Sequence, residues 1–121
     1  MSDITKQSLT ELVENIKNKN LSSTDVTKAF IDRSEKSKEL NAYITEDFTS
    51  ALNKAKKFDQ KPNLDLKLPG IPMAVKDLFC TKDVKTTAGS KILNNFVPTY
   101  ESTVTENIWK EGAILLGKLN C

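Results

Sequence analysis

A lysine that follows an apolar run is the residue in this chain best placed to do chemistry. Lys76 ends the stretch LPGIPMAVK, which begins at Leu68, and Asp77 follows it. Burial at a strand end lowers the pKa of a lysine and can turn the amine into a base. The requirement is severe, since a lysine with the ordinary pKa of ~10.4 is neutral in only about one molecule in 2500 at pH 7. Lys76 is therefore either a partly buried base or a solvated lysine at a strand end.

Hydroxyl and thiol side chains follow this lysine closely in the sequence. Thr86, Thr87 and Ser90 flank a glycine in the stretch TTAGS. This pattern is typical of a turn, and the same hydroxyls would also suit the wall of a pocket. Cys80 is interpreted as a simple buried cysteine or, alternatively, as a thiolate nucleophile near Lys76.

The absence of histidine narrows the chemistry that the chain can supply by itself. With no histidine, the chain alone cannot form a Ser-His-Asp or Cys-His apparatus or a two-histidine zinc motif. Two cysteines, Cys80 and Cys121, make neither a disulfide scaffold nor a metal-ligand spacing. The sequence also lacks the glycine patterns of nucleotide-binding loops. Acid–base chemistry would therefore use lysine, carboxylates or hydroxyls, and we expect no cofactor or metal in this chain.

Charge and hydropathy limit the expected surroundings of the protein. The net charge is +2, without a basic block, so we expect no direct contact with nucleic acid. No apolar run approaches the ~18 residues of a membrane span, and the N-terminus lacks the apolar stretch of a secretory signal. A cytoplasmic protein that does not enter a membrane is expected.

The elements that must position Lys76 begin with helices in residues 1–60. Apolar residues recur at helical spacing from Leu9 to Ile16. A second helix is expected to begin at Ser22, with Asp25 in its first turn. Residues 40–45 form a candidate short strand, and Thr45 is expected to cap a third helix. Apolar residues mark one side of that helix: Phe48, Ala51, Leu52, Ala55 and Phe58.

Two apolar strands separated by a helix are predicted in residues 61–121. The first strand is 71–75, and the second is 113–116. Between them, 101–111 is expected to form a helix whose residues Val104, Ile108 and Trp109 face inward and which stops at Gly112. Such a unit implies a parallel pair of strands with a right-handed crossover.

The predicted fold class is α/β, with N-terminal helices followed by the start of a mixed, mainly parallel sheet. Residues 1–121 are treated as one N-terminal fragment, helical over 1–60 and α/β over 61–121. Because the second strand lies almost at the C-terminus, we expect 113–116 to be an uncovered edge and the isolated chain to self-associate.

Three stretches, in the same order, resemble the amidase signature family. These are Leu68–Asp77, Thr86–Ser90 and Glu111–Lys118. The N-terminal half is similar to the glutamine-hydrolysing A subunits of tRNA-dependent amidotransferases within that family. The resemblance covers about residues 5–120 and implies a truncated amidase signature fold.

The resemblance also implies a mechanism and partners. Lys76 matches the family lysine, which acts as general base in a Ser-Ser-Lys triad through a bridging serine, while a second serine attacks the amide. Glutamine would be the substrate of the full-length protein. Ammonia would pass to a B subunit, which would hold ATP and Mg²⁺ and through which tRNA would be reached. A C subunit would complete a heterotrimer.

Both serines of the triad are expected beyond residue 121, so the isolated chain is expected to be inactive. The end of the chain, Leu119-Asn120-Cys121, also differs mildly from the usual family sequence. Two alternatives stay open, namely a fragment of another amidase of the family and a non-catalytic interaction module.

Overall fold

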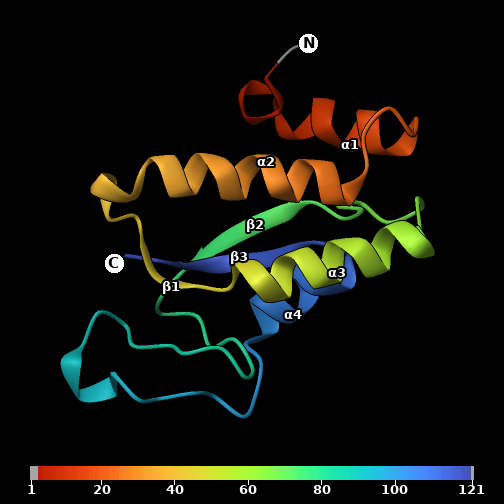
Figure 1. Ribbon diagram of the computed structural model, residues 1–121. Coiled ribbons are helices and arrows are strands. Elements are labelled where there is room, and N and C mark those ends of the chain that lie inside the picture. The colour runs from red at the N-terminus through yellow and green to blue at the C-terminus, as the bar shows by residue number, and fades with distance from the viewer. Residues whose placement is uncertain (1–2, 121) are drawn as a thin grey trace.

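The computed structural model describes residues 3–120, so Cys121 lies outside the described part. Its helices are α1 (Leu9–Lys17), α2 (Ser23–Lys36), α3 (Phe48–Gln60) and α4 (Thr103–Lys110). Its strands are β1 (Tyr43–Glu46), β2 (Pro72–Lys76) and β3 (Ile114–Leu119). Short 3-10 turns cover Ile4–Lys6 (η1), Lys38–Leu40 (η2) and Lys91–Leu93 (η3). In the view of Figure 1, α1 and α2 lie above the sheet and the segment between β2 and α4 lies below it.

The three strands form one mixed sheet in the order β1-β3-β2. β2 runs parallel to β3, with Val75 opposite Lys118, and β1 runs antiparallel to β3. The predicted α/β class and the parallel pair joined through a helix are therefore confirmed. The expectation that 113–116 would be an uncovered edge is wrong, because β3 is the central strand and residues 113–116 are only 4–8% exposed.

Helix boundaries follow from side chains that satisfy free backbone N–H groups. Ser22 accepts a hydrogen bond from the N–H of Asp25, and the carboxylate of Asp25 accepts one from the N–H of Ser22. This reciprocal cap confirms the predicted start of α2. The predicted cap at Thr45 is wrong, because Thr45 lies within β1 and pairs with β3, and α3 begins only after Asp47.

Two apolar clusters hold the helices to the sheet. In one, Leu12 and Ile16 of α1 pack with Val26 of α2 and with Ile71. In the other, alanines of α3 pack against the aliphatic side chains of β3: Ala51, Ala55, Ile114 and Leu116. Small alanine side chains let α3 lie close to the sheet, so the predicted apolar side of α3 is confirmed.

Strand β1 approaches β3 at a glycine. A Cβ atom at Gly117 would collide with the carbonyl oxygen of Thr45 and lie 2.9 Å from the ring of Tyr43. The absence of a side chain at residue 117 therefore permits the antiparallel pairing that makes β3 a central strand.

Helix α4 presents a different face from the one expected. Thr105 is fully buried, whereas Val104 is 53% exposed, so the prediction that Val104 faces inward is wrong. The reason is the cap: Ser102 accepts a hydrogen bond from the N–H of Thr105, and the Thr105 hydroxyl also contacts the carbonyl of Cys80. This polar contact turns Thr105 toward the segment that follows β2. No helix within residues 3–120 combines the length and apolar character that crossing a membrane requires.

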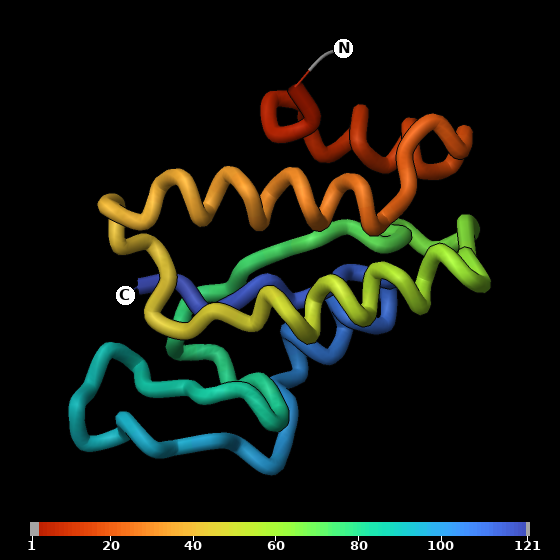
Figure 2. The backbone as a smooth tube through the Cα atoms, viewed as in Figure 1, coloured from red at the N-terminus to blue at the C-terminus, as the bar shows by residue number. Residues whose placement is uncertain are grey.

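The segment from Asp77 to Ser102 leaves the end of β2, makes a long excursion and returns beside its own start (Figure 2). Backbone hydrogen bonds join its outgoing and returning halves, from Asp83 to Pro98 at 2.9 Å and from Thr86 to Phe96 at 3.0 Å. Ser102 then donates to the carbonyl of Cys80 at 2.8 Å. The sequence after Lys76 is thus folded back against the sheet end.

Candidate active site

Lys76 is the last residue of β2, and its side chain is exposed. The next residue, Asp77, is fully buried, so the two side chains point to opposite faces, as strand alternation predicts. No ion pair within residues 3–120 involves Lys76. The Lys76 amine is therefore not engaged by a carboxylate from residues 3–120. Its role as a base stays a prediction.

The buried cation of this region is Lys118 on β3, a residue that the sequence pattern does not single out. Its side chain is completely buried. Its Nζ donates to the carbonyl oxygen of Phe79 at 2.7 Å and to the hydroxyls of Thr81 at 3.1 Å and Thr86 at 2.8 Å. The carboxylate of Asp77 lies 3.6 Å away and completes an ion pair. Every N–H bond of the ammonium therefore has an oxygen partner.

Burial and charge act in opposite directions on this lysine. Burial lowers the pKa of Lys118, while the nearby carboxylate of Asp77 works against that effect by favouring the ammonium. Asp77 in turn accepts hydrogen bonds from the backbone N–H and the hydroxyl of Thr87. The ammonium of Lys118 thus has hydrogen-bond acceptors, and the carboxylate of Asp77 has hydrogen-bond donors. Such additional hydrogen bonds are what offset the desolvation of a buried ion pair.

The TTAGS stretch combines the two roles that the sequence left open, a turn and a lining of polar side chains. Thr86 and Thr87 are buried and serve the ion pair, Thr86 through Lys118 and Thr87 through Asp77. Ser90 is partly exposed and caps the start of η3 by accepting a hydrogen bond from the N–H of Ile92. The stretch is therefore a turn whose threonines line an interior network.

Cys80 is only half-buried, so the prediction of a simple buried cysteine is not met in full. Its thiol lies 3.5 Å from the hydroxyl of Tyr100 and donates a hydrogen bond to it. Cys80 is not part of a disulfide. Within residues 3–120, no three His, Cys, Asp or Glu side chains lie together as metal ligands would.

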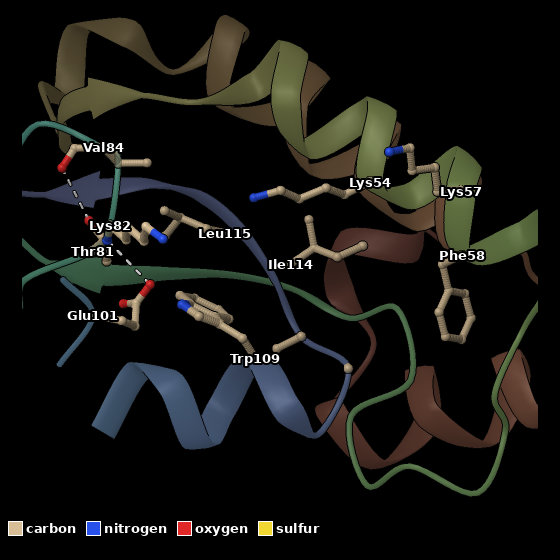
Figure 3. A pocket seen from close by; sticks show the side chains of 12 residues that line it. Lys54, Lys57, Phe58, Thr81, Lys82, Val84, Glu101, Trp109, Ile114 and Leu115 are labelled. Carbon is tan, nitrogen blue, oxygen red and sulfur yellow. Dashed lines mark hydrogen bonds between the residues drawn. The ribbon is translucent and has the colours of Figure 1, made fainter. Parts of the chain in front are cut away.

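A cavity of about 450 Å³ lies between α3, α4 and β3. Figure 3 shows Lys54 of α3 reaching toward Leu115, with Trp109 and Glu101 on the other side. Thr81 lines this cavity and also binds Lys118. Lys76 does not line it, so the cavity and the end of β2 are separate features.

Known proteins match the chain over nearly all of its length. A family model described as "Amidase" matches residues 25–121. The chain is 79% identical over 121 residues to the A subunit of glutamyl-tRNA(Gln) amidotransferase from Pelagibacter ubique (strain HTCC1062), covering all of this chain and 25% of that protein. It is 47% identical over 122 residues to the protein of the same name from Hyphomonas neptunium (strain ATCC 15444), covering 99% of this chain and 25% of the relative.

Solved structures share the fold at lower identity. The native peptide amidase from Stenotrophomonas maltophilia matches with a TM-score of 0.86 and 28% identity, over 95% of this chain and 25% of that chain. A fatty acid amide hydrolase matches with a TM-score of 0.85 and 26% identity, over 96% of this chain and 21% of that chain. The chain spans about a quarter of the length of the curated relatives that it matches.

Proposed function

Because the chain belongs to the amidase family, we propose that it is the N-terminal part of the glutamine-hydrolysing A subunit of a tRNA-dependent amidotransferase. The observation that carries this proposal is the 79% identity to a named A subunit over all 121 residues. Solved amidases with other names share only 26–28% of their residues with the chain. The sequence is therefore far more similar to A subunits than to those hydrolases.

Lys76 is proposed as the general base of the enzyme. Its amine accepts a proton from a bridging serine, which in turn accepts the proton of a nucleophilic serine. The nucleophilic oxygen then attacks the side-chain amide carbon of glutamine, ammonia leaves with a returned proton, and water hydrolyses the acyl-enzyme to glutamate. Neither serine is assigned to a position among these 121 residues, so the isolated chain is proposed to be inactive.

The position of Lys76 supports this role. It stands at the carboxyl end of β2 in a parallel pair, and sites of open α/β sheets form outside the carboxyl ends of such strands. The side chain is exposed and engages no carboxylate within the described residues. Catalytic groups supplied by another part of the polypeptide could therefore approach the amine without displacing an ion pair.

The partners are proposed from the same relationship. Glutamine is the proposed substrate, and the ammonia is proposed to pass to a B subunit that uses ATP and Mg²⁺ to amidate glutamate on tRNA. A C subunit would complete a cytoplasmic heterotrimer, with tRNA contacted through the B subunit. No phosphate-binding glycine pattern occurs in the sequence, so no residue here is proposed to hold ATP or its metal.

The test compares glutaminase activity of the 121-residue chain with that of the complete reading frame containing it, each with and without Lys76→Ala. Activity is expected only in the complete protein, and loss of the base should lower kcat by roughly 10²–10⁴-fold. Lys110→Ala is the matched control, because Lys110 is an exposed lysine on α4 whose ion-pair partner within residues 3–120 is Glu106. Activity in the short chain, or equal activity of the Lys76 and Lys110 variants, would contradict the proposal.

The substrate range decides between the remaining alternatives. The solved structures with this fold include an aryl acylamidase and a peptide amidase, so the complete protein should be assayed on aryl and peptide amides as well. Hydrolysis of these amides without glutaminase activity would assign the chain to another amidase of the family. Folded protein that hydrolyses no amide would favour a non-catalytic interaction module.

A further inference from the structure

We propose that Lys118 is a positioning residue that, with Asp77, fixes the direction in which Lys76 leaves the sheet. The inference rests on the proposed function, because it matters for catalysis only if Lys76 is the base. It concerns a buried ion pair between the central strand β3 and the residue that directly follows Lys76 at the end of the parallel strand β2.

Lys118 itself is excluded as the base by its contacts. Its Nζ has three hydrogen-bond acceptors within 3.1 Å and a carboxylate at 3.6 Å, all in a completely buried environment. An ammonium has three donors and no acceptor, so this set of oxygens suits the protonated form and leaves no side of Nζ open to a substrate. The Lys118 ammonium therefore has a structural role, which is to bind the segment that follows β2.

The oxygens that accept hydrogen bonds from Lys118 all come from the segment after Lys76. Phe79, Thr81 and Thr86 lie along the outgoing half of that segment, and each binds the same Nζ. A single side chain of β3 therefore ties three points of the segment to the central strand. An apolar side chain at residue 118 would fill the same space but would leave these oxygens without a donor.

Asp77 carries the restraint to the backbone next to Lys76. Its own N–H continues the sheet by donating to the carbonyl of Leu119 at 3.0 Å, and its carbonyl accepts from Ala88 at 2.8 Å. Its carboxylate binds Thr87 and Lys118. Asp77, directly after Lys76, is thus held through its backbone and its side chain. Val75, directly before Lys76, is buried in the sheet.

This arrangement leaves Lys76 as an exposed side chain on a backbone that is fixed on both sides. A base must be held within hydrogen-bond reach of the proton it takes, and small displacements cost large factors in rate. The ion pair would therefore act on kcat, through the aim of the Lys76 amine, and would leave substrate binding unchanged.

The test uses the complete protein and two variants of different severity. Lys118→Met removes the cation, and Thr87→Val removes one hydroxyl from Asp77 while keeping the side-chain shape. We expect kcat for amide hydrolysis to fall at least tenfold in both variants with KM unchanged. Thr27→Val is the matched control, because the Thr27 hydroxyl is also buried but has no hydrogen-bond partner among residues 3–120. Equal kcat in Thr87→Val and Thr27→Val would overturn the inference.

A second comparison separates positioning from general loss of structure. If Lys118 acts through Lys76, Lys118→Met should lower the residual rate of the Lys76→Ala protein by less than twofold. The same tenfold loss in both backgrounds would mean that Lys118 acts independently of Lys76. Full activity of the Lys76→Ala single variant would instead refute the proposed function. Because that variant is measured first, this result is distinguished from a failure of the inference about Lys118.

A readout without catalysis covers the case in which Lys118→Met does not fold. The rate at which acetic anhydride modifies Lys76 in the complete Thr87→Val protein can be compared with the parent by mass spectrometry, with Lys110 as internal reference. We expect a change of severalfold at Lys76 and none at Lys110. Identical modification rates at Lys76 in the two proteins would overturn the inference.

Discussion

Two lysines on neighbouring strands have opposite environments, and the difference follows from the sheet. Lys76 is the last residue of an outer strand, whereas Lys118 lies on the central strand and is covered by the segment after β2. The sequence holds a signal for the buried lysine. Asp77 and Lys118 each follow a predicted strand, and the carboxyl ends of parallel strands meet at one edge. What the sequence does not show is that the segment after β2 folds back over β3, which places Lys118 inside.

Asp47 offers a pH test at the level of one residue. It precedes α3 without a side-chain cap, and burial raises the pKa of its carboxyl, with Lys54 acting in the opposite direction. A raised pKa means that the folded state binds the proton more tightly, so stability falls as the pH rises from the unfolded pKa through the folded pKa, and the loss is complete above the folded pKa. We expect Asp47→Asn to raise Tm at pH 7.

The gain from Asp47→Asn should vanish below pH ~3.9, where the carboxyl is protonated in both the folded and the unfolded chain. Melting curves of parent and variant at pH 3 and pH 7 provide the measurement. Asp32→Asn, at an exposed position of α2, is the control for a change of charge alone. A Tm gain of the same size at both pH values would show that titration of Asp47 is not its cause.

At the scale of elements, α2 and α3 are joined by a carboxylate from one helix that caps the other. Asp59 of α3 accepts hydrogen bonds from the backbone N–H groups of Ser23 and Thr24 at 2.9 Å each, and from the Thr24 hydroxyl at 2.5 Å. Ser23 also donates to the carbonyl of Gly70 at 2.6 Å. The start of α2 is thus fixed to α3 and to the chain that enters β2.

Removing this cap should destabilise the fold measurably. Asp59→Ala leaves two N–H groups of α2 without their acceptor, and we expect the free energy of unfolding to fall by about 1–2 kcal/mol. Urea unfolding followed by circular dichroism gives the value. Asp32→Ala removes a carboxylate from the side of α2 and should change stability little. Comparable losses in the two variants would show that the contacts of Asp59 contribute nothing specific.

The elements that the sequence predicted well are those specified by local patterns. Apolar spacing and Ser22 sufficed for α1 and α2, and two apolar runs sufficed for β2 and β3. The errors arose where tertiary contacts overrode local signals. Thr45 resembles a cap but is held in a strand by pairing with β3, and Val104 resembles a core residue but is displaced by the polar contacts of Thr105. Neither partner is visible in a local window.

At the scale of the whole molecule, apolar side chains gather on the excursion between β2 and α4. Large exposed fractions occur at Leu78, Ile92, Val97 and Tyr100, with Ile92 at 93%. The sheet also has two outer strands, β1 and β2, beside the central β3. Both features favour association, since apolar surface and strand edges are the usual sites of contact between chains. The self-association predicted from the sequence therefore stays a prediction, with a different surface as its cause.

Ile92→Lys tests this surface directly in the 121-residue chain. Burying an isoleucine side chain contributes about 1.5–3 kcal/mol, so a lysine there should weaken self-association roughly ten- to hundredfold. Thermal stability should not change, because the side chain is almost fully exposed within the chain. Sedimentation equilibrium over a range of concentrations gives the association constant. Leu40→Lys is the control, because Leu40 is also an exposed aliphatic residue, 72% exposed, but lies in η2. A parent chain that is monomeric at high concentration would refute self-association itself. Equal weakening by Ile92→Lys and Leu40→Lys would mean that association does not use the segment after β2.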